Sequence, residues 1–168
     1  MTMTMQNYQN KSKVKLLILD VDGVLTDGTR TVDINGDIVA KQFFDRDFYY
    51  TKLLQQKGVK VVCISGDNRI NEPWCRNKGL NFLLAISAED KLKTFTDLIH
   101  TLDLTYNETT FVGDSIIDLP CMILAGISFA PANAEPEVSI KSKVNLKASG
   151  GYGVVEEVYS YLVKHQLI

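Results

Sequence analysis

The chain has 168 residues, of which 45% are hydrophobic and 23% are charged. This length suits a single domain with a buried core, and the composition is ordinary for a globular protein. The net charge of -2 gives no electrostatic reason to expect nucleic acid or an anionic membrane surface as a partner. No apolar run approaches the length of a transmembrane helix, so we expect no membrane partner.

Residues 1–12 are polar and lack an apolar segment, so we expect a loose N-terminal tail rather than a signal peptide or anchor. The folded domain is then expected over residues 13–168. Three cysteines (Cys63, Cys75 and Cys121) are widely spaced and form no C-x-x-C pair. This usage favours reduced thiols in a cytoplasmic protein.

Apolar, β-branched runs alternate with helical patterns along the chain. The predicted strands are 16–19, 59–64, 82–85, 110–112, 127–130 and 144–146, and the predicted helices are 48–56, 71–78, 88–102, 117–124, 135–141 and 154–164. This alternation predicts an α/β fold, with a Rossmann-like, mostly parallel sheet covered by helices on both faces.

One segment breaks the alternation directly after the first strand. Residues 29–34 and 38–43 flank Asn35-Gly36, a dipeptide typical of hairpin turns. We therefore expect a β-hairpin that protrudes from the sheet.

The first strand ends in two aspartates, Asp20 and Asp22, and Gly23 then allows a sharp turn. Two carboxylates about 4 Å apart repel each other by roughly 4 kcal/mol at an effective dielectric near 20. A site that keeps both ionised requires a cation, and carboxylate oxygens prefer a hard one. The pair therefore indicates a metal-assisted active site.

Other polar residues follow the predicted strands, and ligands of open parallel sheets bind at the carboxyl ends of the strands. These residues are Ser65 and Gly66 after the second parallel strand, Lys91 in the third helix, Gly113, Asp114 and Ser115 after the fourth strand, and Asp118 one helical turn further on. We expect them to converge at one edge of the sheet.

This set suits phosphoryl transfer. Asp20 can attack phosphorus and form an acyl phosphate, while Asp22 can protonate the leaving alcohol and then deprotonate water. Asp114 together with Asp20 can hold Mg²⁺. The Ser65 hydroxyl, backbone N–H groups and Lys91 can neutralise the phosphoryl oxygens. Asp118 can orient a water or hold Lys91 in place.

The set, in this order, resembles the haloacid dehalogenase-like phosphohydrolases. Residues 20–26 match their first motif, D-x-D-G-x-[VL]-[TL], and residues 113–118 match their fourth, G-D-x-x-x-D; Ser65 and Lys91 match the second and third. The resemblance implies that Asp20 is the nucleophile and that Asp22 is the acid/base. It also implies Mg²⁺ held by Asp20, Asp22 (through its main-chain carbonyl) and Asp114. Gly66, Ser115 and Asp118 then support the site.

Receiver domains of response regulators also combine acidic residues, a hydroxyl and a lysine. Their phosphoacceptor aspartate follows the third strand, whereas the third predicted strand here ends in Ala85-Ile86-Ser87. The receiver interpretation therefore fails.

The gaps between Asp22 and Ser65 and between Ser65 and Lys91 leave no room for the cap domain of many relatives. We expect the hairpin to close the site instead, paired with hairpins of neighbouring copies in a closed ring. This organisation resembles the small tetrameric 3-deoxy-D-manno-octulosonate 8-phosphate phosphatases and the related nonulosonate 9-phosphate phosphatases. Residues 20–28, 113–120 and the glycine-rich 150–153 carry the resemblance, which implies a homotetramer.

The sequence also departs from the octulosonate pattern. The usual T-G-R is Ser65-Gly66-Asp67 here, and the usual D-G-x-G is 47–50, with aromatic residues in place of glycines. A 3-deoxy-2-keto sugar-acid phosphate is the expected substrate. A nonulosonate 9-phosphate and a non-catalytic oligomerisation module remain open alternatives. The residues expected to meet the substrate carboxylate are Arg46, Arg69 and Lys147.

Overall fold

The computed structural model describes residues 13–168, so the predicted N-terminal tail (residues 1–12) lies outside the described residues. The main sheet has six parallel strands in the order β5-β4-β1-β6-β7-β8. These strands are β1 (Leu16–Asp20), β4 (Lys60–Ser65), β5 (Asn81–Leu84), β6 (Thr109–Val112), β7 (Ile127–Ala130) and β8 (Val144–Asn145). The α/β fold predicted from the alternation is confirmed.

The helices are α1 (Asp45–Gln56), α2 (Asn71–Asn77), α3 (Ala88–Thr101), α4 (Leu119–Leu124), α5 (Pro136–Lys141) and α6 (Val154–Lys164), with a short 3₁₀ turn η1 (Tyr106–Glu108). Helix α1 begins three residues earlier than predicted. Its first turn carries Asp45 and Asp47, whose negative charges stabilise a helix N-terminus. Among the described residues, no helix combines the length and apolarity needed to traverse a bilayer.

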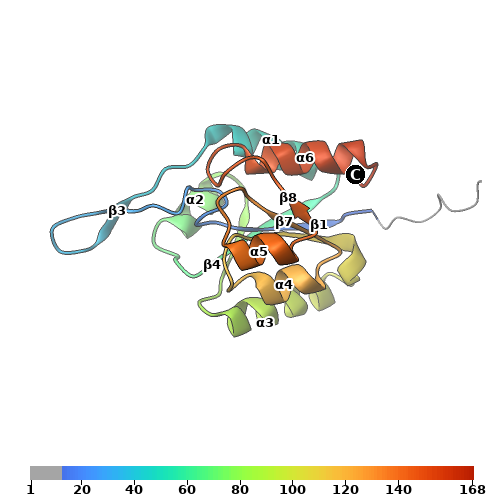
Figure 1. Ribbon diagram of the computed structural model, residues 1–168, viewed down its shortest axis with the longest axis horizontal. Coiled ribbons are helices and arrows are strands. Elements are labelled where there is room, and N and C mark those ends of the chain that lie inside the picture. Colours follow the sequence, from blue (N-terminus) through green and yellow to red (C-terminus); the bar gives the residue numbers. More distant parts are fainter. Residues whose placement is uncertain (1–12) are drawn as a thin grey trace, which may run out of the picture.

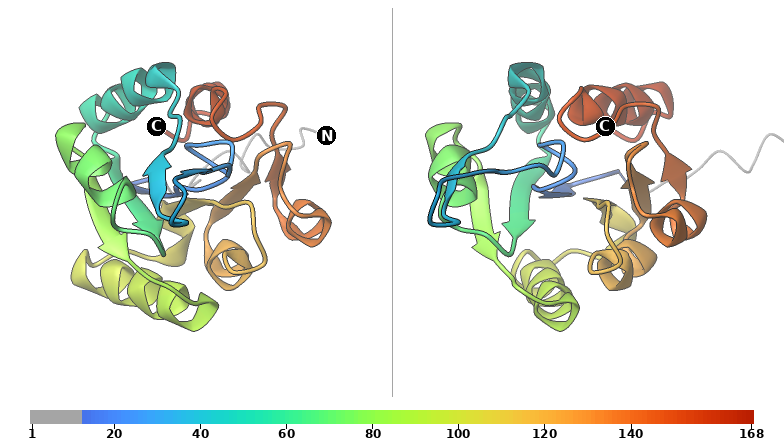
Figure 2. Two further views of the ribbon diagram at one scale, coloured as in Figure 1. Left: turned by 90° about the vertical axis from the view of Figure 1, so that its left-hand side faces the viewer. Right: turned by 60° about the vertical axis from the view of Figure 1, so that its left-hand side comes forward.

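Strand β1 is buried on both sides and separates two hydrophobic clusters. Leu17 and Leu19 belong to the cluster that includes side chains of α1 and α6. Leu16 and Ile18 belong to the cluster that includes side chains of α3, α4 and α5. Figures 1 and 2 show α1 and α6 on one side of the sheet and α3, α4 and α5 on the other. The alternating residues of one strand thus hold the three layers together.

The hairpin consists of β2 (Thr31–Val32) and β3 (Ile38–Ala40), which form a separate antiparallel sheet. Its strands are shorter than the predicted segments 29–34 and 38–43, but it extends away from the body as expected (Figure 1). The Asp33 carboxylate accepts the backbone N–H groups of Asn35 and Asp37, both at 2.9 Å, and Gly36 adopts a φ of 83°. An aspartate-stabilised turn with a left-handed glycine therefore closes the hairpin.

The strand order creates a crevice beside β1. From β1 the chain continues to β4 and β5 on one side, and then returns to β6 on the other side. The connections that follow β1 and β6 therefore diverge, and ligands of such sheets bind at this point. Asp20 ends β1 and Asp114 lies two residues after β6, so the crevice is where the acidic residues meet.

Candidate active site

Lys91 binds two buried carboxylates at the end of β1. Its Nζ lies 2.6 Å from Oδ1 of Asp20 and 2.6 Å from Oδ1 of Asp118, and only 6% of its side chain is exposed. Burial alone would lower the pKa of Lys91, but the attraction of the two carboxylates outweighs it and raises the pKa. Lys91 is therefore a fixed positive charge beside Asp20.

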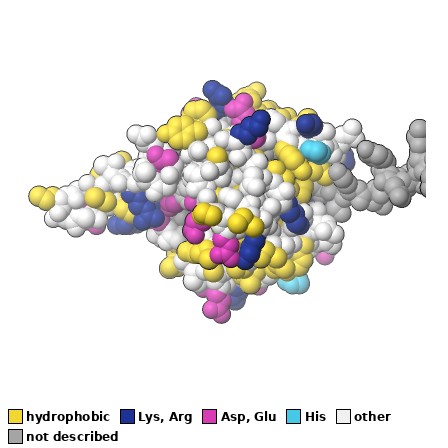
Figure 3. All heavy atoms as spheres, viewed as in Figure 1, with side chains coloured by type: hydrophobic (Ala, Val, Ile, Leu, Met, Phe, Trp, Pro, Cys, Tyr) yellow, Lys and Arg dark blue, Asp and Glu magenta, His cyan; other side chains and the backbone are white. Residues whose placement is uncertain are grey.

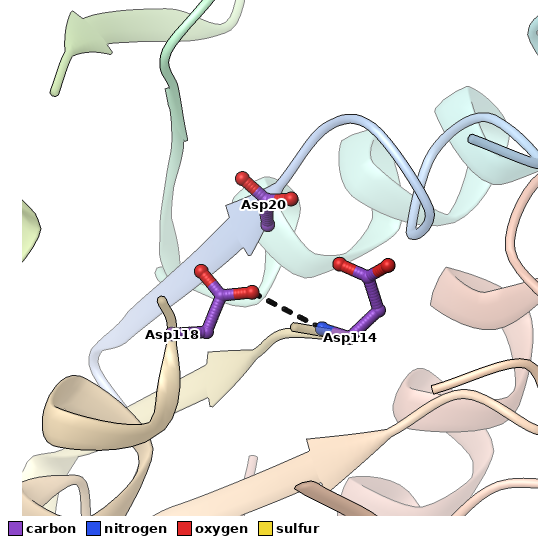
Figure 4. A group of neighbouring side chains, drawn as sticks. All are labelled: Asp20, Asp114 and Asp118. Atoms are coloured by element: carbon purple, nitrogen blue, oxygen red, sulfur yellow. Dashed lines mark hydrogen bonds between the residues drawn. The ribbon is translucent and has the colours of Figure 1, made fainter. Parts of the chain in front are cut away.

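Asp20, Asp114 and Asp118 form an acidic cluster whose oxygens lie within 4.8 Å of one another (Figure 4). Oδ2 of Asp118 accepts the N–H groups of Asp114 and Ser115, both at 3.2 Å, so both oxygens of Asp118 are used within the protein. By contrast, Oδ1 of Asp114 is buried and has no hydrogen-bond partner among the described residues. Asp118 thus organises the site, while Asp114 has a free ligand atom.

Two residues of this cluster, Asp20 and Asp114, have pKa values above that of an ordinary aspartate. Burial, followed by repulsion from Asp118, raises the pKa of Asp20 well above its usual value, although Lys91 opposes the shift. The same two causes raise the pKa of Asp114 to about 7. A divalent cation would favour the ionised forms of both. Their charge and the free oxygen of Asp114 therefore fit a hard metal ion.

Asp22 was expected to bind the metal through its main-chain carbonyl, and its side chain does not belong to the three-carboxylate cluster. It points instead into a separate polar network, where its Oδ2 accepts hydrogen bonds from Lys41 Nζ and Asn71 Nδ2, both at 3.0 Å. Asn71 Nδ2 also donates to Ser65 Oγ at 2.9 Å. The acid/base candidate and the phosphate-binding hydroxyl are thus joined through Asn71.

Two glycines of the predicted motifs leave the space that the acidic residues occupy. Gly23 has a φ of 90°, and a Cβ there would collide with the Asp114 carboxylate. A Cβ at Gly113 would lie 2.5 Å from Cβ of Asp118. Both positions therefore require glycine for steric reasons, and at Gly23 the backbone conformation requires it as well.

A cavity of about 340 Å³ opens onto these groups. Its walls include all of the predicted catalytic and supporting residues except Asp118, namely Asp20, Asp22, Ser65, Gly66, Lys91, Asp114 and Ser115. The structure thus brings together residues that lie up to 95 positions apart in sequence, from Asp20 to Ser115. A phosphate group bound here would lie among them.

Sequence reasoning missed two basic residues of the site, Arg30 and Lys41. Arg30 lines the cavity, with Nη2 3.8 Å from Oδ2 of Asp22 and 46% of its side chain exposed. Lys41 lies behind Asp22, and its side chain is fully buried. No motif marks either residue, but both lie on the hairpin that was expected to close the site.

The three predicted carboxylate-binding residues are not among the residues that line this cavity. Arg46 forms an ion pair with Glu156 at 3.1 Å. Arg69 lies 3.6 Å from Asp37 and 3.9 Å from Asp67. The backbone N–H of Lys147 donates to Glu157 on α6.

The glycine-rich segment 150–153 packs against the turn that follows β1. A Cβ at Gly150 would collide with the carbonyl of Gly23, and the Gly151 N–H donates to the Val24 carbonyl at 2.9 Å. Asn133 bridges the two segments, accepting the Gly150 N–H at 2.6 Å and donating to the Gly23 carbonyl at 3.2 Å. This segment therefore braces the loop that carries Asp22.

Fold and site together define a haloacid dehalogenase-like hydrolase, and a family model of that description matches residues 75–157. The 3-deoxy-D-manno-octulosonate 8-phosphate phosphatase of Escherichia coli K12 is 34% identical over 154 residues, which cover 91% of this chain and 81% of that protein. The enzyme of the same name from Haemophilus influenzae is 32% identical over 161 residues, covering 94% and 87% of the two chains. The chain belongs to the 3-deoxy-D-manno-octulosonate 8-phosphate phosphatase family.

Solved structures agree with this assignment. The cobalt-bound Haemophilus influenzae enzyme has a TM-score of 0.84 and 33% identity, with 92% of this chain and 90% of that chain covered. The Moraxella catarrhalis enzyme, solved with magnesium, phosphate and KDO, has a TM-score of 0.83 and 26% identity, with 90% and 86% covered. Relatives with this fold thus hold divalent metals, and the present chain has an acidic cluster suited to one.

Proposed function

We propose that the chain hydrolyses the phosphate monoester of a 3-deoxy-2-keto sugar acid, of the 3-deoxy-D-manno-octulosonate 8-phosphate type, with Mg²⁺. The observation that carries this proposal is the buried Asp20, which lines the cavity, lies 2.6 Å from Lys91 and neighbours Asp114. A carboxylate nucleophile, a fixed cation and a metal-binding carboxylate meet there around one space. The magnesium, phosphate and KDO bound by the Moraxella catarrhalis relative support the choice of metal and substrate.

In the proposed reaction, a carboxylate oxygen of Asp20 attacks phosphorus and the bond to the sugar oxygen breaks. Asp22 gives its proton to that oxygen, which leaves as the alcohol. Asp22 then takes a proton from water, whose oxygen attacks the aspartyl phosphate and releases inorganic phosphate and free Asp20. Lys91 and the Ser65 hydroxyl offset the charge of the phosphoryl oxygens throughout.

Asp20, Asp114 and the main-chain carbonyl of Asp22 would hold the Mg²⁺. The ion supplies positive charge that offsets repulsion between the dianionic phosphate and the acidic cluster. Asp118 keeps Asp114 in place through the hydrogen bond to its backbone N–H. The Oδ1 of Asp114, which has no hydrogen-bond partner in the part of the chain that the structure describes, supports this assignment.

Two basic residues, Lys91 and Arg30, line the cavity, and we propose that Arg30 binds the substrate's carboxylate. Lys91 is already bound to two aspartates, whereas the ion pair of Arg30 within residues 13–168 is a long contact to Asp22, at 3.8 Å. Arg69 lies on the loop between β4 and α2, 3.9 Å from Asp67, and is a second candidate for binding the substrate's carboxylate. Arg46 and Lys147 would reach a substrate only if it extends beyond the cavity.

A nonulosonate 9-phosphate is the rival substrate, because Asp67 stands on the cavity wall where the octulosonate pattern has arginine. Measuring phosphate release by the purified chain with Mg²⁺ distinguishes the octulosonate from the nonulosonate substrate. The panel comprises 3-deoxy-D-manno-octulosonate 8-phosphate, a nonulosonate 9-phosphate and a neutral sugar phosphate. We expect the highest kcat/KM with the octulosonate ester. A preference for the nonulosonate ester favours the rival, and equal rates on all three would refute acidic-sugar specificity.

We further propose that the active form is a homotetramer that works in the cytoplasm. Three large apolar side chains of the hairpin (Val32, Ile34 and Val39) are exposed by 55%, 100% and 56%. Their burial against hairpins of other copies would also pair the free edges of β2 and β3. The three free, buried cysteines suit a reducing compartment.

A further inference from the structure

Lys41 follows β3 at the base of the hairpin, and its side chain is fully buried. Its Nζ donates to Oδ2 of Asp22 at 3.0 Å, Oδ2 of Asp67 at 2.7 Å and Oδ1 of Asn71 at 3.0 Å. These are the three hydrogen bonds that an ammonium group can donate. A buried charge is tolerated only when it is paired and hydrogen-bonded. The three acceptors therefore form a specific binding site for the Lys41 ammonium group.

The partners of Lys41 come from three segments of the active site. Asp22 lies on the turn after β1, Asp67 on the loop after β4, and Asn71 at the start of α2. Asp22 and Asp67 line the cavity, whereas Lys41 is not among its lining residues. Lys41 therefore acts on Asp22 from behind the cavity.

Asp67 explains how this cation is accommodated. The Lys41 ammonium lies 2.8 Å from Oδ1 of Asp22 and 2.7 Å from Oδ2 of Asp67, so one positive charge separates two carboxylates. An arginine at position 67, as in the octulosonate pattern, would instead place a second cation against a buried ammonium. Lys41 and Asp67 thus form a matched pair.

We propose that Lys41 is a positioning residue for the phosphatase reaction, fixing the carboxylate of Asp22 for proton transfer and coupling the hairpin to the active site. The inference rests on the proposed function, in which Asp22 protonates the leaving group. Lys41 itself contacts neither the cavity nor the attacking Asp20.

The leaving group provides the sharpest test. An alcohol with a high pKa needs a proton as it departs, whereas p-nitrophenolate hardly does. We therefore compare kcat/KM for phenyl phosphate and p-nitrophenyl phosphate in the wild type and Lys41→Met, with Mg²⁺. Because kcat/KM reports phosphoryl transfer to Asp20, Lys41→Met should lose roughly 100-fold on phenyl phosphate. On p-nitrophenyl phosphate it should lose no more than about tenfold.

Further variants separate positioning from folding. Lys41→Met removes the cation between the Asp22 and Asp67 carboxylates, so the Tm of this variant should fall. The double variant Lys41→Met/Asp67→Asn should recover the Tm but keep the leaving-group defect. Mg²⁺ affinity by calorimetry should stay within about threefold of wild type, because Lys41 does not contact the acidic cluster. Lys52→Met removes an exposed lysine of α1 and should change none of these values.

Equal losses on both esters, or no loss, in the double variant would overturn the role of Lys41. That outcome is distinct from failure of the proposed function. If the wild type releases phosphate from neither aryl ester nor any sugar phosphate, the phosphatase assignment falls, and the inference with it. If it cleaves aryl esters but no acidic sugar phosphate, only the substrate assignment falls.

Discussion

Asp47 is a buried carboxyl group on α1 that titrates outside the catalytic site. Its Oδ1 accepts the Val155 N–H at 2.9 Å, and its Oδ2 has no hydrogen-bond partner among the described residues. Burial raises its pKa from 3.8 to about 6, against the opposing effect of the backbone hydrogen bonds. The folded state therefore binds this proton more tightly than the unfolded chain does.

The protonated Asp47 carboxyl group therefore contributes to the free energy of unfolding fully below about pH 4, and this contribution is lost as the pH rises through about 6. Two pKa units correspond to roughly 3 kcal/mol. Urea unfolding across this range should show that Asp47→Asn gains stability relative to the wild type by about that amount. Asp45→Asn alters an exposed acid of the same helix and should show no such trend. Parallel stability curves for Asp47→Asn and the wild type would contradict the assignment.

At the scale of single residues, the sequence could place Asp20, Asp22 and Asp114 because strand ends and motif spacing mark them. Lys41 and Asn71 carry no such mark. Lys41 meets Asp22 from 19 positions away, at the base of a hairpin whose direction depends on its packing, and Asn71 meets it from 49 positions away, at the start of α2. Arg30 was missed for the same reason. Long-range polar contacts of this kind follow from tertiary structure, which local pattern does not encode.

At the scale of elements, the loop between β8 and α6 holds the turn after β1. Gly150→Ala should push the Gly23 carbonyl away and displace Asp22. A displacement of about 1 Å in a catalytic group lowers kcat by roughly 100-fold. Steady-state kinetics of this variant, together with its Tm, provide the measurement.

Gly79→Ala is the matched control for this substitution. A Cβ at Gly79 meets no atom within 4 Å, but its φ of 74° is unfavourable for alanine. We expect a stability loss of about 1 kcal/mol with kcat unchanged. If Gly150→Ala behaves in the same way, the loop does not support the site.

The elements themselves were predicted well where burial is complete. The sequence of β4 is an almost continuous apolar run, which is typical of central parallel strands. Its observed bounds differ from the predicted ones by one residue at each end. The hairpin strands were overestimated because alternating residues there have no body of the protein to pack against. The start of α1 was missed because capping charges, not apolar periodicity, define it.

At the scale of the whole molecule, the hairpin is the one large feature of the described chain that leaves the three-layer body (Figure 1). A space-filling view shows apolar side chains near its tip (Figure 3), where Ile34 is fully exposed. A two-stranded hairpin alone is marginally stable in water. Association through this surface would therefore order the hairpin and, through Lys41, the site.

Ile34→Asp should prevent this association, because it places charge in the expected contact. Analytical ultracentrifugation should show four chains per particle for the wild type and fewer for Ile34→Asp. Ile140→Asp, on α5, alters a side chain that is 82% exposed and should leave the mass unchanged. A wild type that sediments as a monomer would exclude the tetramer, and an unchanged mass for Ile34→Asp would exclude the hairpin contact.

In the proposed reaction Asp20 carries the phosphoryl group during turnover, and every other role in the site depends on this step. The most direct measurement is rapid acid quench of the enzyme with Mg²⁺ and a phosphate ester, followed by peptide mass spectrometry. We expect a single added phosphoryl group on Asp20 and none in Asp20→Asn, which should also lose turnover while keeping its fold. A phosphoryl group on another residue, or unimpaired hydrolysis by Asp20→Asn, would contradict it.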